Sequence, residues 1–197
     1  MSIQFLSKSF AIALVLSAAH SAHAAVLWNE NTLGDLSNDR LAPTALLLSA
    51  GANDVLGTVG DSGAGIDRDY FSVTVPTGMR LSALTLLGNT NVSGGVSFIA
   101  LQVGPQITVT PSGAGAANLL GYTHYGNDLI GQDLLPLLAY GYSDGLAAGV
   151  YSVWVQETGG PASYGLRFEL APAVPVPGAA LLFGSGLLGL AGAIRRR

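Results

Sequence analysis

The middle of this 197-residue chain consists of short apolar runs that end at Gly, Pro, Asn or Asp, without a long stretch of helical period. Residues 69–75 alternate strictly, which places Phe71, Val73 and Val75 on one face of a strand. Strands of this kind bury their apolar faces by packing sheet on sheet. The pattern therefore predicts an all-β fold, with eight to nine short strands in a single antiparallel β-sandwich.

Turn-forming residues separate the predicted strands. A turn is expected at 51–54 and a loop at 60–65, and residues 111–146 are expected to be irregular, with one short helix or strand near 134–140. The last two strands flank a Gly- and Pro-containing turn and are predicted to pair as an antiparallel hairpin. The predicted strands are 45–48, 55–59, 69–75, 81–87, 96–103, 106–110, 149–156 and 163–170.

The start of the chain has the features of a secretory signal. Residues 1–24 contain an apolar run and end in small residues, with Ala22 and Ala24 at the spacing that signal peptidase reads. We therefore expect a signal helix that is cleaved off between Ala24 and Ala25. Residues 25–172 are then the size of one domain and long enough to bury a core.

Residues 173–197 contain a short motif, an apolar run and an arginine cluster in that order. The seventeen apolar residues would span about 25 Å as a transmembrane helix, which is just enough for the core of a bilayer. The terminal arginines should stay in the cytoplasm, so that the preceding chain lies outside the inner membrane. The three parts are Val174, Pro175, Val176 and Pro177; residues 178–194; and Arg195, Arg196 and Arg197.

This order resembles the PEP-CTERM sorting signal of Gram-negative bacteria in its Val-Pro-x-Pro variant, with Val176 where the namesake glutamate would stand. The resemblance implies that a membrane-embedded exosortase cuts near residues 174–177. The protein would be anchored in the inner membrane transiently and would then reach the cell surface or the extracellular matrix. It also implies an association with exopolysaccharide and biofilm. A plain C-terminal anchor is the alternative.

A second resemblance covers about a hundred residues of the middle. The segments 67–81, 146–155 and 164–166 are similar to the bacterial pre-peptidase C-terminal (PPC) domain. That resemblance implies a jelly-roll-like β-sandwich over residues 25–172, and it brings no catalytic motif.

Charge and cysteine content exclude several classes of protein. Residues 25–172 carry twelve carboxylates, four arginines and no lysine, a net charge of −8. Such a surface repels phosphate backbones, so nucleic acid is not an expected partner. The chain has no cysteine, which rules out disulfides, thiolate catalysis and cysteine-bound zinc.

Acidic residues near two predicted turns suggest a structural calcium site. Two lie in one loop near the mature N-terminus, and two begin a strand that a sandwich could bring close to that loop. Calcium binds six to eight oxygens from carboxylates and carbonyls. In the alternative, the loop carboxylates cap turns and Arg40 or Arg68 neutralises a neighbour. The four candidate ligands are Asp35, Asp39, Asp67 and Asp69.

No catalytic constellation is apparent. His124 is the one histidine of residues 25–172, and no G-x-S-x-G elbow accompanies it. Trp154 and several tyrosines suggest carbohydrate binding, since flat aromatic faces stack on sugars, although Trp154 could equally lie under a loop. Two hypotheses remain: a non-catalytic exported protein of the envelope or matrix, and a carbohydrate-binding module of that matrix.

Overall fold

The chain folds mainly into β-strands, as the alternation of its sequence predicts. The computed structural model describes residues 24–92 and 95–173, and nine strands lie in these residues. The strands are β1 (Ala25–Asn29), β2 (Thr44–Leu47), β3 (Gly51–Asp61), β4 (Ile66–Val75), β5 (Met79–Leu86), β6 (Ser97–Val103), β7 (Gly121–Tyr125), β8 (Gly149–Gln156) and β9 (Ala162–Pro172). The short helices are α1 (Glu30–Leu33), α2 (Leu135–Leu138), η1 (Ala116–Asn118) and η2 (Asn127–Leu129).

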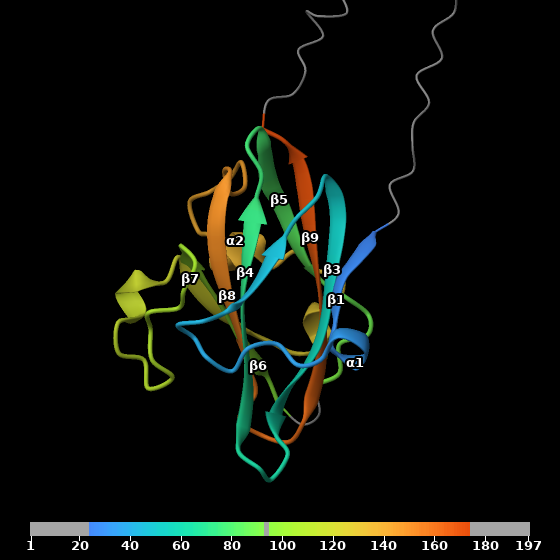
Figure 1. Cartoon of the computed structure of the whole chain (residues 1–197), viewed down its shortest axis with the longest axis vertical. Helices are drawn as coiled ribbons and strands as arrows, with labels where there is room; N and C mark the ends of the chain where they lie inside the picture. The colour runs from blue at the N-terminus through green and yellow to red at the C-terminus, as the bar shows by residue number, and fades with distance from the viewer. Residues whose placement is uncertain (1–23, 93–94, 174–197) are drawn as a thin grey trace, which may run out of the picture.

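The sheet curls because β3 and β4 pair only at the tip of their hairpin. Two residue pairs join them, Gly60 with Asp67 and Asp61 with Ile66. Beyond the tip the strands separate, so that β3 pairs with β9 and β4 pairs with β8, both antiparallel. The order β5-β9-β3-β4-β8-β6-β7 therefore forms two strand groups that face each other, as Figure 1 shows.

The N-terminal residues fill the edges that the divergence of β3 and β4 leaves free. β1 pairs in parallel with residues 53–56 of β3, and β2 pairs in parallel with residues 71–74 of β4. The chain between them, residues 30–43, passes from one strand group to the other in front of β4 (Figure 1). We call it the crossing segment.

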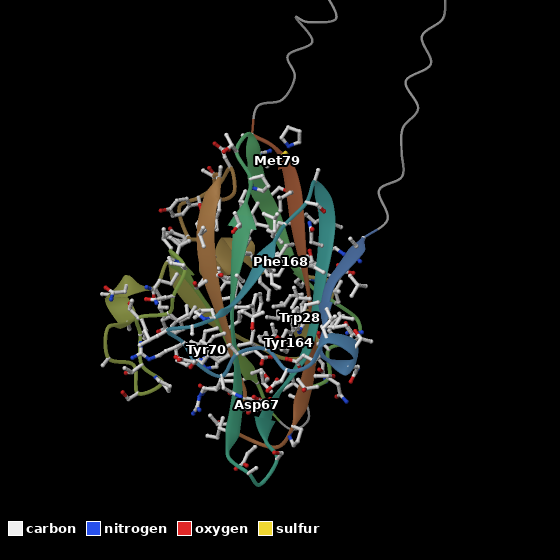
Figure 2. All side chains as sticks on the ribbon, viewed as in Figure 1. Trp28, Asp67, Tyr70, Met79, Tyr164 and Phe168 are labelled. Atoms are coloured by element: carbon white, nitrogen blue, oxygen red, sulfur yellow. The ribbon has the colours of Figure 1, made fainter. Side chains whose placement is uncertain are left out.

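The core lies between the two strand groups. Phe71, Val73 and Val75 are at most 2% exposed, which confirms the face predicted from their alternation. Phe71 packs edge-on against Phe168 of β9, with ring centroids 6.1 Å apart. Figure 2 shows Phe168 and Tyr164 in the interior, where they connect the strand groups by apolar contact.

The opposite face of β4, β8 and β6 is covered as well. Tyr70 and Trp154 are buried there together, under Ile107 and Val109 of the loop that follows β6. This loop is irregular, so the strand predicted for residues 106–110 is wrong. Its apolar residues point to the sheet as a cover, and they need no strand pairing to do so.

The predicted hairpin of the last two strands is also wrong. β8 matches its predicted bounds, but it pairs with β4 and β6, whereas β9 pairs with β3 and β5. The turn-rich residues between them therefore connect the two strand groups. Residues 111–146 contain α2 within the predicted range of 134–140 and also β7, which the sequence pattern did not indicate.

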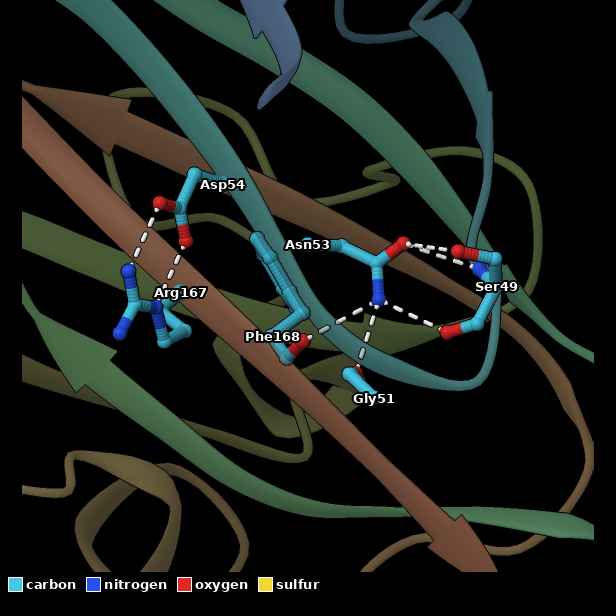
Figure 3. A network of polar contacts seen from close by, with 6 residues as sticks. All are labelled: Ser49, Gly51, Asn53, Asp54, Arg167 and Phe168. Atoms are coloured by element: carbon cyan, nitrogen blue, oxygen red, sulfur yellow. Dashed lines mark hydrogen bonds and ion pairs between the residues drawn. The ribbon is translucent and has the colours of Figure 1, made fainter. Parts of the chain in front are cut away.

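The turn expected at residues 51–54 is the beginning of β3. Asn53 is 1% exposed, and its side-chain amide bonds to Ser49 and to the backbone carbonyl of Gly51. Asp54 pairs with Arg167 of β9 at 2.8 Å, as Figure 3 shows. These partners satisfy polar side chains that would otherwise favour a turn.

Several predictions about the ends of the chain lie outside the described residues. They are the signal helix up to residue 23 with Ala22, the sorting motif at 174–177, the transmembrane helix at 178–194 and the arginines at 195–197. In the part that is described, no helix has both the length and the apolar character needed to cross a bilayer.

Candidate functional site

One end of the core contains a buried carboxylate. Asp69 lies on β4, on the same face as Phe71, and is 0% exposed. Its Oδ2 accepts a 2.7 Å hydrogen bond from the hydroxyl of Tyr164 on β9. Its Oδ1 has no hydrogen-bond partner among the described residues. A buried carboxylate with an unpaired oxygen is costly, and such groups often have a functional explanation.

A glycine on β3 makes room for the Tyr164 ring. Gly57 pairs with Tyr164 in the ladder, and a Cβ at Gly57 would lie 2.6 Å from the Tyr164 hydroxyl oxygen. Only a residue without a side chain fits beside the ring. The sequence of β3 therefore helps to place the Tyr164 hydroxyl against Asp69.

A second carboxylate comes from the beginning of the crossing segment. Glu30 is the first residue of α1, which Asn29 caps. Glu30 Oε1 accepts from the backbone N–H of Leu36 at 3.2 Å. Glu30 Oε2 accepts from the backbone N–H and the hydroxyl of Thr58, at 2.6 and 3.0 Å. These bonds hold the carboxylate between the crossing segment and β3.

A third carboxylate, that of Asp35, follows on the same segment. Its neighbour Leu36 is buried in the core, and the Ser37 carbonyl accepts from the backbone N–H of Tyr70 at 2.9 Å. Asp35 is therefore fixed next to the part of β4 that carries Asp69. Glu30, Asp35 and Asp69 each offer a carboxylate oxygen, and these oxygens lie within 4.8 Å of one another. We call these three residues the acidic cluster.

Burial raises the pKa of two members of the cluster, Glu30 and Asp69. Burial raises the pKa of Asp69 to about 9; the negative charge of Glu30 adds to this, and the hydrogen bond from Tyr164 opposes it. Burial also raises the pKa of Glu30 and that of Asp67. In the absence of a cation, this end of the core thus disfavours full ionisation.

Among the described residues, no arginine forms an ion pair or hydrogen bond with the acidic cluster. Arg167 forms the only ion pair within the described residues, with Asp54. Arg40 and Arg80 donate to backbone carbonyls, and Arg68 donates to a glutamine side chain. The contacts therefore give no support to the alternative in which Arg40 or Arg68 neutralises the loop carboxylates.

The structure brings together two of the four predicted calcium ligands. Asp35 and Asp69 meet in the acidic cluster, whereas Asp39 Oδ1 accepts from the backbone N–H of Leu41 at 2.8 Å and caps a turn. Asp67 lies two residues before Asp69, outside the group of three, and its Oδ1 is buried without a partner among the described residues. Sequence reasoning missed Glu30, although it lies only five residues before Asp35.

Comparison with known proteins assigns the chain to no family. No family model, curated protein or solved structure matches it. The basis for any function is therefore the sequence and geometry of the chain itself.

Trp154 lies under a loop. It is 4% exposed and packs against Phe98 and Tyr70, with ring centroids 4.7 and 5.7 Å away. The ring therefore has no free face for stacking on a sugar. The alternative prediction, in which Trp154 lies against a loop, is confirmed.

Exposed aromatic rings occur instead beside α2. Tyr140 is 92% exposed and Tyr142 is 51% exposed. Both line an open hollow of about 240 Å³, together with Ser82, Asp133 and Ser143. Aromatic faces next to hydroxyl and carboxylate groups are suited to a sugar ring.

Proposed function

We propose that this chain is a non-catalytic exported protein, directed to the cell surface or extracellular matrix by a C-terminal exosortase sorting signal. The observation that carries the proposal is the order of motif, apolar run and arginines in residues 174–197. Signal peptidase and the exosortase are its partners during export, and the inner membrane holds it before processing. In the matrix it lies among exopolysaccharides.

The end of the described chain agrees with this proposal. β9 ends at Pro172, which pairs with Met79, and the next residue, Ala173, is exposed. The proposed motif begins at the residue after Ala173. Met79 and Asp67 lie toward opposite ends of the molecule in Figure 2, and Asp67 is two residues before Asp69 of the acidic cluster on β4.

We infer that the curled sheet is a jelly-roll-like sandwich of the kind found in PPC domains, extending over residues 25–172. Two features support this inference. The strand groups face each other across one core, and the connections after β4, β5 and β8 each pass from one group to the other. Such crossings are typical of Greek-key sandwiches.

A non-catalytic role is favoured by the position of the one histidine in residues 25–172. His124 lies on β7 with an exposed side chain, and its ring packs edge-on against Phe98 at 5.7 Å. The contact with Phe98 gives His124 a packing role, so that its presence on β7 requires no catalytic function.

Carbohydrate binding is the second candidate function, and the hollow beside Tyr140 and Tyr142 is the observation that favours it. A pull-down with bacterial exopolysaccharide tests it. We expect the double variant Y140A/Y142A to lose retention and the control Tyr122→Ala, an exposed tyrosine on β7, to keep it. Equal retention by all three proteins would contradict a sugar site at the hollow.

Mass spectrometry of the exported protein tests the sorting proposal. The full chain is expressed in a Gram-negative host with an exosortase and in the same host after deletion of the exosortase gene. With the enzyme, we expect surface or medium protein that begins at Ala25 and lacks the peptide containing Arg197. Without it, Arg197 should be retained. An intact Arg197 terminus in exported protein from both hosts would contradict the proposal and indicate a plain anchor.

A further inference from the structure

We propose that the acidic cluster of Glu30, Asp35 and Asp69 binds one Ca²⁺ ion, which ties the crossing segment to β4. This inference goes beyond the sorting proposal and does not depend on it. The three carboxylates come from two separate parts of the chain, since Glu30 and Asp35 lie on the crossing segment and Asp69 lies on β4.

The unpaired oxygen of Asp69 is the independent observation that points to a ligand. Asp69 is fully buried, and its Oδ1 has no partner among the described residues. One carboxylate oxygen of Asp69 lies within 4.8 Å of an oxygen of Glu30 and of an oxygen of Asp35. A cation between the three carboxylates would supply the missing partner and would offset their mutual repulsion.

The donor set favours calcium over other metals. All three ligands are carboxylate oxygens, which suit hard cations and not the soft metals that prefer sulfur or imidazole. Calcium–oxygen distances are about 2.4 Å, so that oxygens up to about 4.8 Å apart can contact one ion, whereas magnesium requires a tighter octahedron at about 2.1 Å. The spacing of the three oxygens is thus compatible with Ca²⁺, and water would supply the remaining ligands.

The acidic cluster borders solvent at Asp35. An open hollow is lined by Asp35, Asn38, Asp67 and Arg68, with the β3–β4 turn on its other side. Asp67 adds negative charge near Asp69 without belonging to the acidic cluster. A hydrated cation can therefore reach Asp35, the exposed member of the acidic cluster, from solvent.

The ion would act as a clamp on the fold. β1 and β2 join different strand groups, and the crossing segment connects them. Bonds from Ca²⁺ to Asp69 and to Glu30 and Asp35 of the segment would fix this connection against β4. Because Ca²⁺ would bind the folded state and not the unfolded chain, it should raise the midpoint of thermal unfolding.

Calorimetry and thermal unfolding with CaCl₂ test the proposal. The full chain, purified in a mild detergent and freed of metal with EDTA, should bind one Ca²⁺. Its unfolding midpoint should rise by about 5 to 10 °C when free Ca²⁺ is a hundred times Kd. Asp35→Asn should weaken binding at least tenfold. Asp35 is exposed and accepts none of the hydrogen bonds found in the described residues, so this variant should fold normally.

Asp39→Asn is the matched control. It removes the same charge from the same segment, and its retained side-chain oxygen can still cap the turn at Leu41. The site is supported if Asp39→Asn keeps its Ca²⁺ affinity within threefold of wild type while Asp35→Asn binds Ca²⁺ at least tenfold more weakly. No binding by the wild-type chain, or an equal loss in both variants, would overturn it. Tighter binding of Mg²⁺ than of Ca²⁺ would overturn the assignment to calcium.

Discussion

The hydroxyl of Tyr164 donates a 2.7 Å hydrogen bond to Oδ2 of Asp69 and so connects β9 to β4 across the core. The two residues come from opposite strand groups, near the end at which β3 and β4 form their hairpin. This bond orients one oxygen of Asp69, and the other oxygen has no hydrogen-bond partner in the part of the chain that the structure describes. The predictions about stability and cation binding depend on that arrangement.

Replacing Tyr164 with Phe should destabilise the protein by about 1 to 3 kcal/mol, because Asp69 Oδ2 loses the one donor that the described residues give it in a buried site. Urea unfolding in EDTA measures the change. The control is Tyr151→Phe, which removes a 2.9 Å bond to the carbonyl of Ala147 at a partly buried position and should cost about 1 kcal/mol or less. A Tyr164→Phe variant as stable as wild type would contradict the role of this bond.

Gly57→Ala should also destabilise the protein, by about 1 to 3 kcal/mol, since the new methyl group would lie 2.6 Å from the Tyr164 hydroxyl oxygen. The ring must move, and its bond to Asp69 is weakened. Gly88→Ala is the control, because a Cβ there meets nothing within 4 Å. Urea midpoints that fall equally for the two variants would show that the contact with Tyr164 is unimportant.

Without metal, stability should fall as the pH rises. The pKa of Asp69 is about 9 in the folded protein and 3.8 for the unperturbed group. Between these values the unfolded chain has released the proton and the folded protein still holds it, so rising pH favours unfolding, by up to about 1.4 kcal/mol per pH unit. Urea midpoints in EDTA from pH 5 to 8 should therefore decline.

Asp69→Asn is the control for this pH dependence. The variant lacks the titrating group, so its decline should be shallower, and the raised pKa values of Glu30 and Asp67 would cause the remainder. A wild-type midpoint that increases from pH 5 to 8 in EDTA would contradict the account of Asp69.

The network in Figure 3 contains a buried amide and a more exposed ion pair, and their loss should have different costs. Asn53→Ala removes a side-chain amide that is 1% exposed, together with its bonds to Ser49 and to the buried carbonyl of Phe168, for an expected loss of about 2 to 3 kcal/mol. Asp54→Ala breaks a pair whose Arg167 side chain is 34% exposed, for about 1 kcal/mol or less. Urea unfolding that gives the opposite order would contradict this assignment.

The sequence predicted the strands better than their pairing. The alternation of residues 69–75 and the bounds of β8 match the structure, because both depend on local pattern. The pairing of β8 with β4 and β6 is non-local, and a turn-rich connection to β9 looks the same whether or not the strands pair. Asn53 looked like a turn residue because asparagine is common in turns. Its buried hydrogen bond to Phe168 forms only in the tertiary fold, so the local pattern does not reveal it.

The candidate site could be predicted only in part, for the same reason. Carboxylates near turns suggested Asp35 and Asp69, and the structure brings them together. Asp39 and Asp67 looked equivalent to them in the sequence, but Asp39 caps a turn and Asp67 lies outside the group of three. Glu30 is the first residue of a helix, a position where acidic residues are common. The sequence pattern therefore gave no sign that its carboxylate bonds to Thr58.

Trypsin cleavage after Arg40 tests most directly whether one cation holds the crossing segment against β4. Residues 25–172 contain four arginines and no lysine, and only Arg40 lies on that segment. Both the wild-type chain and D35N are digested at one saturating Ca²⁺ concentration, which keeps the protease constant. We predict cleavage after Arg40 about tenfold or more slower in the wild-type chain, with cleavage after Arg80 on β5 little changed. Equal rates after Arg40 in the two proteins would contradict the account.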